Sequence, residues 1–388
     1  MKIAIDTRWI FPHISGIGAY TRALVRELAA LDQKNQYLLL FDDPEMQTRL
    51  RDELELDRFD HVETLRLRHG LFAPMNQLTT PAVLRRHGVD LFHSSNYMIP
   101  LHAFPRHRRG AMGCVVTIHD VIPMIFPNHA PKSRKARLYP IYRALMIEIG
   151  RRADHIIADS TVSRRDIIHH LRIPDHRADR VHTIPCGVAE GYRSIPARPP
   201  KAPDSLAPRT ILYVGRMDPY KNVETLLRAF TLIRNRCPVP VELAIVGPPD
   251  PRYPHYPELA RDLRIEKALR WTGYLSDKEL LDLFGKADLL IHPSRYEGFG
   301  LQVAEAMAAG IPVISSNGGS LPEVVGEAGL LVDPDDVKGF ADHAVDVLSS
   351  PPLWQTLSDA GRLQAAQFTW QRTARETLAV YQRCCEAP

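Results

Sequence analysis

Two glutamates and a glycine-rich turn form the part of this 388-residue sequence whose chemistry is most specific. Glu297 and Glu305 stand on either side of a turn that contains Gly298 and Gly300. A helix that begins near Gly300 would point unpaired N–H groups and a partial positive charge at an anion such as a phosphate. The carboxylates would repel a phosphate but accept hydrogen bonds from hydroxyl groups. The pattern suits a ligand with a diphosphate centre and hydroxylated rings on both sides, as in a nucleotide sugar.

Two cations, Arg216 and Lys221, lie five residues apart between an expected strand at 210–214 and an expected helix at 223–234. Both could point at one anion from such a turn. An Arg grips a diphosphate with paired donors, and a Lys adds a compact point charge. The pair therefore predicts a second contact for the same diphosphate.

These segments carry a resemblance to a known family. The stretch from Ile291 to Asp336, which begins IHPSRYEGFGLQVAEAMAAG, resembles the donor-site signature of retaining glycosyltransferases of family 4. Glu297 and Glu305 stand at that family's two-glutamate spacing. VGRMDPYKN, which contains Arg216 and Lys221, is similar to the family's phosphate-binding turn.

The resemblance implies a retaining transfer of a hexose from a nucleotide diphosphate sugar, with no metal or other cofactor. Arg216, Lys221 and the amides near Gly300 would meet the charge of the leaving diphosphate. Glu297 would hold sugar hydroxyls, and Glu305 would hold the ribose. The other donor-binding residues that the resemblance implies are Gly16, Gly18, Gly215, Tyr274, Gly298, Phe299, Leu301 and Gln302.

His119 and Asp120 directly follow an expected buried strand at 115–118. Ligands of open parallel sheets bind outside the carboxyl ends of strands, so both side chains are expected at a site. Asp120 could equally cap the segment that follows it. The surrounding TIHDVIPMIFP is similar to a subgroup of family 4 that contains polysaccharide mannosyltransferases, which implies that the His lies beside the donor hexose and the Asp toward the acceptor. The expected catalytic residues are therefore His119, Asp120, Arg216, Lys221 and Glu297.

Other positions leave alternatives open. Gly16 and Gly18 end a loop after the first strand, where an ordinary turn fits as well as a donor contact. Ser160 matches a family position, but a helix cap explains it equally well. Cys186 stands where the family usually has Asn, which departs from the resemblance.

Strands and helices alternate through both halves of the sequence, which predicts α/β domains with parallel sheets covered on both faces. The resemblance implies the GT-B architecture, with two Rossmann-like, doubly wound domains that face a cleft. The expected boundaries are an acceptor-side domain at 1–188, a Pro-rich linker at 189–208 and a nucleotide-sugar domain at 209–367. A last helix at 368–388 would cross back to the first domain.

Composition supports a globular cytoplasmic protein: 45% of residues are hydrophobic and 24% are charged, five cysteines show no metal-type spacing, and no signal peptide or membrane-spanning run is evident. The net charge of +4 is uneven. Residues 101–152 carry ten basic and two acidic residues, a local excess of +8. This segment is either a solvated basic face or a surface that contacts an anionic membrane or phosphorylated acceptor, and its core is Arg106, Arg108, Arg109, Lys132, Arg134, Lys135 and Arg137.

The expected partners are a nucleotide-sugar donor, with GDP-mannose favoured by the subgroup resemblance, and a glycan or lipid-linked acceptor of cell-surface polysaccharide or lipopolysaccharide synthesis. Nucleic acid is not expected, since no recognised motif accompanies the basic segment. Three alternatives use the same fold: a phosphorylase, a sugar-phosphate synthase and a nucleotide-sugar epimerase. A non-catalytic nucleotide-sugar binding protein is a further alternative of a different class.

Overall fold

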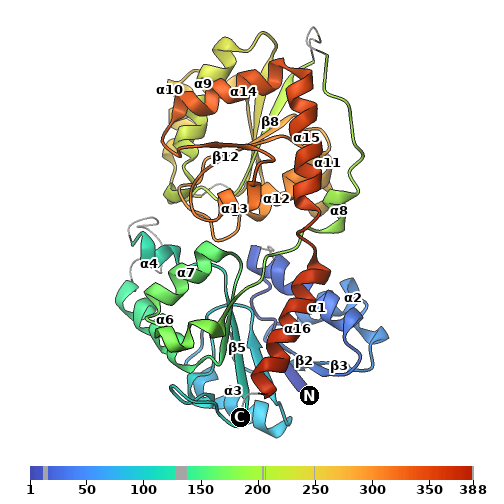
Figure 1. Ribbon diagram of the computed structural model, residues 1–388, viewed down its shortest axis with the longest axis vertical. Coiled ribbons are helices and arrows are strands. Elements are labelled where there is room, and N and C mark those ends of the chain that lie inside the picture. Colours follow the sequence, from blue (N-terminus) through green and yellow to red (C-terminus); the bar gives the residue numbers. More distant parts are fainter. Residues whose placement is uncertain (12–15, 128–137, 203–204, 206, 249, 387–388) are drawn as a thin grey trace. The chain divides into compact units, whose positions relative to one another are not determined.

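The computed structural model describes residues 1–11, 16–127, 138–202, 205, 207–248 and 250–386, which form two compact units (Figure 1). The first unit contains Met1–Ile125, Leu138–Gly187 and the segment from Thr369 onward. The second contains Val188–Phe368 and a short stretch that begins at Phe126. Each unit is built on a parallel β-sheet with helices on both sides.

The first sheet has seven strands in the order β3-β2-β1-β4-β5-β6-β7, and every neighbouring pair is parallel. The order runs outward in both directions from the pair β1 and β4, which is the topological switch point where such sheets bind ligands. Its strands are β1 (Lys2–Asp6), β2 (Gln36–Phe41), β3 (Val62–Arg66), β4 (Leu91–Ser94), β5 (Gly113–Ile118), β6 (His155–Ala158) and β7 (Val181–Thr183).

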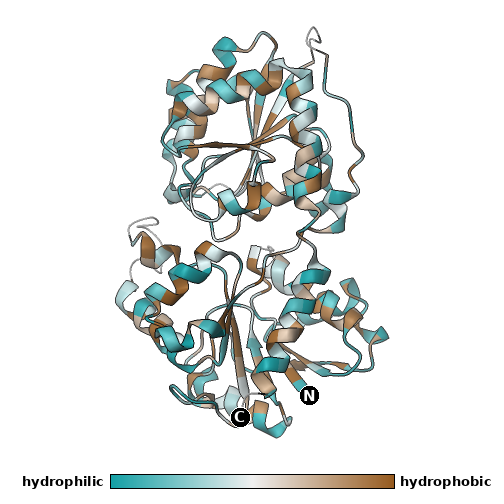
Figure 2. Cartoon of the chain, viewed as in Figure 1, coloured by the Kyte–Doolittle hydropathy of each residue, from teal (hydrophilic) through white to brown (hydrophobic). Residues whose placement is uncertain are grey.

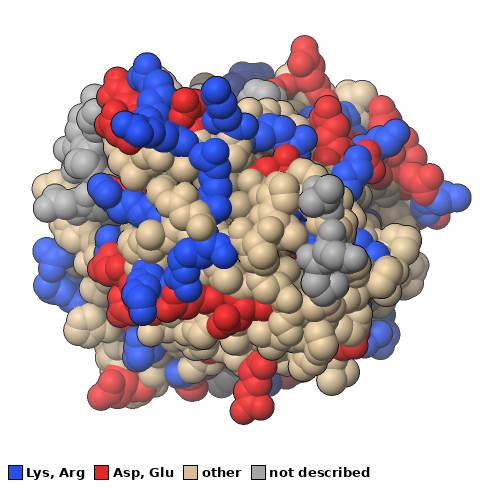
Figure 3. Space-filling model, turned by 90° about the horizontal axis from the view of Figure 1, so that it is seen from above, with Lys and Arg blue, Asp and Glu red and all other residues tan. Residues whose placement is uncertain are grey.

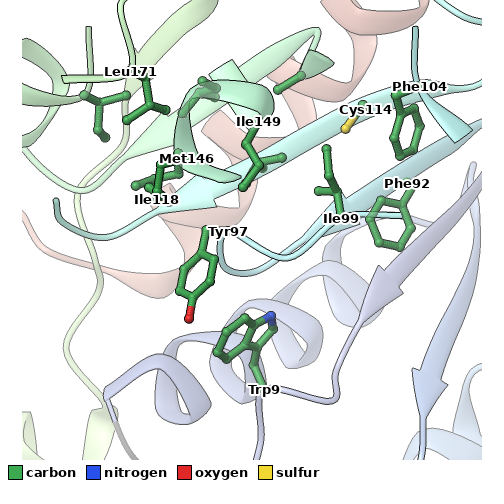
Figure 4. Close-up of a cluster of buried hydrophobic side chains, with 14 of the residues drawn as sticks. Trp9, Phe92, Tyr97, Ile99, Phe104, Cys114, Ile118, Met146, Ile149 and Leu171 are labelled. Carbon is green, nitrogen blue, oxygen red and sulfur yellow. The ribbon is translucent and has the colours of Figure 1, made fainter. Parts of the chain in front are cut away.

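The central strands of this sheet are buried on both faces. All six residues of β5, with the sequence GCVVTI, are buried, as expected for a parallel strand covered by helices. Figure 4 shows part of the core, where the side chains of Phe92 and Phe104 lie together and the hydroxyl end of Tyr97 points toward Trp9. The described helices around the sheet are α1 (Gly16–Leu31), α2 (Pro44–Glu53), α3 (Asn76–Arg86), α4 (Ile122–Ile125), α6 (Tyr139–Arg152), α7 (Thr161–His170) and α16 (Trp370–Glu386).

Helix α16 belongs to the first unit although it ends the chain. It packs on α1 and β5, and its Tyr381 hydroxyl lies 2.6 Å from Nδ1 of the buried His93. Nε2 of His93 lies 2.9 Å from the hydroxyl of Thr117, so both ring nitrogens have partners. Burial lowers the pKa of His93 to about 3, with a smaller contribution from His119, and this histidine is therefore a neutral part of the core.

The second sheet has six parallel strands in the order β10-β9-β8-β11-β12-β13. They are β8 (Arg209–Val214), β9 (Val241–Val246), β10 (Leu269–Gly273), β11 (Leu289–His292), β12 (Val313–Ser316) and β13 (Leu330–Val332). The described helices are α8 (Glu190–Arg193), α9 (Val223–Arg236), α10 (His255–Asp262), α11 (Asp277–Phe284), α12 (Leu301–Ala308), α13 (Leu321–Val325), α14 (Val337–Ser349) and α15 (Pro351–Ala365).

Side-chain polarity follows the two layers of the second unit. Figure 2 shows hydrophobic residues along the strands and on the inner sides of the helices, with hydrophilic residues outside.

Helix α11 begins with a full capping box: Ser276 Oγ accepts from the Glu279 amide, and the Glu279 carboxylate accepts from the Ser276 amide. On the face seen in Figure 3, Lys and Arg are interspersed with Asp and Glu, so no single sign of charge covers it.

The stretch expected as a Pro-rich linker is attached to the second unit where the structure describes it. It begins with α8, whose Tyr192 is buried and packs edge-on against Phe284 at 4.8 Å between ring centroids. Further along, Arg198 and Lys201 both pair with Asp288, at 3.0 and 2.7 Å. The expected linker therefore begins with a short helix and packs on the second unit, where an aromatic residue and two cations find partners.

Two other local expectations differ from the structure. The sequence at 133–153 predicts a long helix that is kinked or broken at its interior Pro140. Residues 133–137 of that stretch lie outside the described residues, and α6 places Pro140 in its first turn, where a missing N–H costs little. Between residues 42 and 86 the structure adds α2, β3 and α3. No helix within the described ranges is long and apolar enough to cross a bilayer.

Candidate functional site

The two turns with candidate donor-binding residues follow neighbouring strands of the second sheet. β8 and β11 pair in parallel, with Ile211 beside Leu289, and β8 also pairs with β9 on its other side. This pair is the switch point of the sheet. The turn from Gly215 to Lys221 follows β8, and the turn from Pro293 to Gly300 follows β11, so both lie at the carboxyl edge of the sheet.

Hydrogen bonds tie these turns together. The amide of Arg295 donates to the carbonyl of Tyr220 at 2.8 Å. Asn222, in the left-handed region with φ 58°, donates from its side chain to the carbonyls of Pro293 and Pro334, at 3.2 and 2.6 Å. The β8 turn therefore has a fixed position relative to the β11 turn.

Lys221, Glu297 and His292 form a buried polar cluster at the junction of the turns. Lys221 Nζ donates to both carboxylate oxygens of Glu297, at 2.7 Å to Oε1 and 2.9 Å to Oε2. Nε2 of His292 lies 2.9 Å from the same Oε1. The structure thus brings together two predicted site residues and adds a third that sequence reasoning missed.

The pair is a strongly coupled ion pair. Burial alone would raise the pKa of Glu297, but Lys221 outweighs it and, together with His292, holds that pKa well below its usual range. Burial would likewise lower the pKa of Lys221, and Glu297 instead raises it. Both groups are therefore charged at neutral pH, and Lys221 neutralises Glu297 rather than presenting a free amino group.

Arg216 is not part of this cluster. Its side chain is 62% exposed, and Nη2 lies 2.7 Å from Oδ2 of the buried Asp218. Asp218 also pairs with Arg252, at 3.2 Å. The two cations that were expected to face one anion are thus held by different carboxylates, Lys221 by Glu297 and Arg216 by Asp218. Gly215 precedes Arg216, and a Cβ atom at this position would lie 2.9 Å from the hydroxyl oxygen of Tyr213.

The glycine-rich turn is closely packed from below. Gly300 has a φ of 94° and is the N-cap of α12, and a Cβ there would come within 2.7 Å of Leu321 Cδ2. Ser320 Oγ donates to the carbonyls of Glu297 and Phe299, both at 3.0 Å. Gly298 and Phe299 are buried in this turn. Packing and the Ser320 bonds therefore fix the backbone that precedes α12.

Helix α12 begins at the predicted residue, Leu301. The first helical amides, those of Leu301 and Gln302, lack partners one turn earlier, as at every helix N-terminus, and both residues are half-buried. The amides of Val303 and Ala304 already donate to the carbonyl of Gly300. These two amides are the groups that the predicted anion site would use.

Glu305 differs from Glu297 in its charge. It lies one turn into α12, half-buried, and hydrogen-bonds with Tyr192 of α8. Burial, with a further contribution from Asp277, raises the pKa of Glu305 to about 8. The sequence suggested two carboxylates, but with this pKa the Glu305 side chain is mainly a neutral carboxyl at pH 7. Tyr274, the predicted base contact, is half-exposed just after β10.

In the first unit, His119 follows β5 and has both ring nitrogens engaged. Nδ1 lies 2.7 Å from Oδ2 of Asp159, and Nε2 lies 3.0 Å from the Ser95 carbonyl. Both partners accept, so the ring must donate from both nitrogens, which requires the imidazolium form. Burial would lower the pKa of His119, but Asp159 outweighs it and raises that pKa. His119 is therefore a fixed cation rather than a free base.

The remaining candidate residues of the first unit lie in helix caps, in a helix turn or in the core. Asp120 Oδ1 accepts from the amide of Ile122 at 3.0 Å, so the capping interpretation holds for that oxygen. Gly16 and Gly18 lie in the first turn of α1 rather than in the expected loop. Ser160 is the N-cap of α7 and accepts from the Ser163 amide. Cys186 is buried.

Three residues that support this constellation were missed by sequence reasoning: His292, Ser320 and Asp159. His292 had a signal, since it is a histidine at the end of a strand and five residues before Glu297. Asp159 directly follows a strand, β6, which pairs with the strand that leads to His119. Ser320 acts through its backbone-directed hydroxyl, which no sequence pattern indicates.

The fold of both units, with doubly wound parallel sheets, defines the GT-B class of glycosyltransferases, as the comparisons show. The family model described as "Glycosyl transferases group 1" matches residues 197–364. The family model described as "Glycosyltransferase Family 4" matches residues 14–190. Sucrose-phosphate synthase from Thermosynechococcus elongatus superposes with a TM-score of 0.74 at 23% identity, over 99% of this chain and 98% of that one. The apo form of the lipopolysaccharide outer core galactosyltransferase WaaB gives 0.67 at 17%, over 99% and 100%.

Similarity in sequence extends over the whole chain. The O-antigen chain mannosyltransferase B of Escherichia coli is 30% identical over 395 residues, which cover 98% of this chain and 99% of that protein. The MMP alpha-(1->4)-mannosyltransferase of Mycolicibacterium hassiacum is 33% identical over 240 residues, or 61% of this chain and 55% of that protein. This chain belongs to glycosyltransferase family 4, and it is a glycosyltransferase.

Proposed function

We propose that this glycosyltransferase moves mannose from GDP-mannose to a glycan or lipid-linked acceptor in the synthesis of a cell-surface polysaccharide. The observation that carries the proposal is the full-length similarity to the O-antigen chain mannosyltransferase B. The cluster of Lys221 and Glu297 beside the start of α12 supports the donor half of the reaction, because cations, amides and carboxylates meet at one sheet edge.

The diphosphate of the donor would bind between Arg216, Lys221 and the amides of Leu301 and Gln302. Lys221 donates to Glu297 in the structure, so donor binding would compete for its amino group. A compact ammonium on a flexible stem can turn toward a neighbouring anion. These groups would stabilise the charge that develops on the leaving diphosphate without a metal ion.

Glu297 and Glu305 would hold the hydroxylated parts of the donor. Glu297 would accept from hydroxyls of the hexose, and Glu305 from those of the ribose. Burial raises the pKa of Glu305 to about 8, and two donating ribose hydroxyls would favour its ionised form and lower that pKa. Tyr274, Gly215, Gly298 and Phe299 would line the donor, and Gly16 and Gly18 would approach it from α1.

The transfer would retain the anomeric configuration. The bond between the anomeric carbon and the leaving phosphate oxygen breaks, and a bond to the acceptor oxygen forms on the same face. The acceptor's proton passes to the departing phosphate oxygen, so no separate base is needed. His119, a cation whose ring nitrogens are both engaged, would line the reacting face, and Asp120 would face the acceptor.

A donor screen tests the proposal. The full chain is heated with GDP-, UDP-, ADP- and dTDP-sugars, and GDP-mannose is expected to give the largest rise in melting temperature. Transfer is then followed by release of GDP with glycan, lipid-linked, phosphate and sugar-phosphate acceptors. Release of GDP only with phosphate or sugar phosphate would instead show a phosphorylase or a sugar-phosphate synthase. Conversion of GDP-mannose to another nucleotide sugar without any acceptor would show an epimerase. Binding without any turnover would show a sensor.

We further propose peripheral contact with an anionic membrane through residues 101–152. Ile141 and Leu138, at the start of α6, are 67% and 46% exposed, so this basic segment also carries apolar groups at the surface. Not every Arg there is available: Arg106, Arg151 and Arg152 all pair with Glu148, and Arg109 donates to the carbonyl of Cys385. Lys132, Arg134, Lys135 and Arg137 lie outside the described residues.

Sedimentation with vesicles tests this contact. The chain is expected to sediment with vesicles rich in phosphatidylglycerol at low salt, and binding should fall as salt rises. A double variant, Leu138→Ser with Ile141→Ser, should remain in the supernatant. Wild-type protein that stays in the supernatant at low salt would disprove the proposal.

A further inference from the structure

His292 is the most confined member of the polar cluster around Glu297. It is the last residue of β11 and has no exposed surface. Its ring stacks on Tyr213 of the neighbouring strand β8, with centroids 6.1 Å apart and planes 16° from parallel. A fully buried ring that stacks on a side chain of the neighbouring strand has little freedom to turn.

The hydrogen bonds of His292 fix its tautomer. Nε2 faces Oε1 of Glu297 at 2.9 Å and Ser294 Oγ at 3.1 Å. A carboxylate only accepts, so the hydrogen must be on Nε2. Nδ1 is buried and has no hydrogen-bond partner among the described residues. A second proton there would leave a buried N–H unpaired, so the neutral ring with its hydrogen on Nε2 is the form that fits.

The other partner of Glu297, Lys221, lies in a turn rather than in a strand and has a longer side chain. Lys221 lies at the end of a short 3₁₀ helix, η4 (Pro219–Lys221), in the turn after β8. Its ammonium is carried on four methylenes and is needed by the diphosphate of the donor. Once Lys221 turns to the diphosphate, Glu297 keeps only one partner within the cluster, the Nε2–H of His292.

We propose that His292 is a positioning residue that holds Glu297 in place for the hexose of the donor, while Lys221 exchanges from Glu297 to the donor diphosphate. The inference rests on the proposed function and deepens it at the same site. His292 acts through a single N–H donor, without a change of charge. The hydroxyls of the hexose then donate to the carboxylate positions that Lys221 has left.

The geometry also explains why a histidine suits the position. Its ring extends from the strand end to the carboxylate while its flat face packs on Tyr213. Glutamine has a donor Nε2 at a comparable distance from the backbone and cannot be protonated. Leucine is close in size and has no donor. The pair His292→Gln and His292→Leu therefore separates the hydrogen bond from the packing.

The experiment compares GDP-mannose with GDP, which lacks the hexose. For His292→Leu, we expect the Kd of GDP-mannose to rise about tenfold or more, with the Kd of GDP unchanged within about twofold. For His292→Gln, we expect both Kd values within about threefold of wild type, and a pH profile of kcat/KM that superimposes on that of wild type. Ser358→Ala, which removes a buried hydrogen bond to the Gly310 carbonyl, controls for lost stability and should change neither Kd.

Each other outcome decides against the inference. Equal losses for GDP and GDP-mannose in His292→Leu would show a general loss of folding rather than positioning of Glu297. A Gln variant as impaired as the Leu variant would show that the imidazole acts by its charge or shape. If Leu fails to fold, the Gln variant alone still tests the idea through its pH profile. Wild-type protein that does not bind GDP-mannose would overturn the proposed function instead, so the two failures are distinguishable.

Discussion

Lys221 Nζ donates to both carboxylate oxygens of Glu297, at 2.7 and 2.9 Å, so one buried cation neutralises one buried carboxylate. The relationship changes how the two residues are understood. From the sequence alone they had separate tasks, one at the phosphates and one at the sugar. In the structure they form one ion pair, and the proposed donor binding requires Lys221 to leave it.

The first prediction concerns the stability of this pair. Lys221→Met leaves the Glu297 charge buried without its cation, which costs about 3–5 kcal/mol. For a domain of this size the melting temperature should fall by roughly 6–20 °C. Glu297→Gln should cost less, because a neutral amide can still accept from Lys221 and His292. Differential scanning calorimetry of the full chain measures both.

The double variant is the control for this prediction. Lys221→Met combined with Glu297→Gln removes both charges and should recover most of the melting temperature that Lys221→Met loses, a non-additivity expected only for residues in contact. Strictly additive losses would contradict a coupled pair. All three variants should lose transfer activity, since Lys221 and Glu297 both contact the donor in the proposed mechanism.

The second prediction separates activity from stability at Arg216. Its side chain is mostly exposed and its ion pair with Asp218 is partly solvated, so Arg216→Ala should change stability by less than about 1 kcal/mol. Loss of one donor to the leaving diphosphate should lower kcat by about 10²–10³. Steady-state kinetics and a melting curve check both parts.

Arg228 provides a matched control for Arg216. It is an exposed Arg of the same unit, on α9, and pairs with Glu224 one turn away. Arg228→Ala should leave kcat and KM at wild-type values. If Arg216→Ala also keeps wild-type turnover, its assignment to the diphosphate is wrong.

How far the sequence predicts this site can be seen residue by residue. The start of α12 near Gly300 could be predicted, because a glycine in a backbone conformation that favours glycine precedes the helix, and Gly310 follows its end in another. The pairing of Lys221 with Glu297 could not be predicted, since it joins residues 76 positions apart through a register of strands that only the fold supplies. Similarly, the pKa of Glu305 depends on burial beneath α8, in a stretch that appeared to be a linker.

The third prediction concerns Glu305 and pH. Its pKa is about 8 in the folded protein and near 4.5 in an unfolded chain, so the unfolded state ionises first as pH rises. The stability that the neutral Glu305 carboxyl contributes to the folded protein is therefore greatest below about pH 4.5. It is lost progressively as the pH rises to about 8. Glu305→Gln cannot ionise and should escape this loss.

Melting curves between pH 5 and 9 test the sign. The melting temperature of Glu305→Gln minus that of wild type should increase with pH up to about 8 and then stay constant. Glu279→Gln provides the comparison, since Glu279 is an exposed glutamate whose pKa is lowered by hydrogen bonds with Ser276. That variant should show no increase over the same pH range, and an equally flat curve for Glu305→Gln would contradict the raised pKa.

The last prediction concerns the ion pair of His119 and Asp159 in the first unit. Asp159 raises the pKa of His119 above its ordinary value near 6.5, despite burial of the ring. A histidine whose pKa is raised on folding contributes stability that is greatest below its pKa in the unfolded state. This contribution is lost as the pH rises through its pKa in the folded state. Asp159→Asn removes the carboxylate, so its cost should be larger at pH 6 than at pH 9. Asp32→Asn is a suitable comparison, because Asp32 is a buried aspartate of the same unit whose lowered pKa keeps it ionised throughout this range. Its cost should be the same at both pH values, and a cost of Asp159→Asn that is likewise constant would mean that His119 is not the cation its two acceptors require.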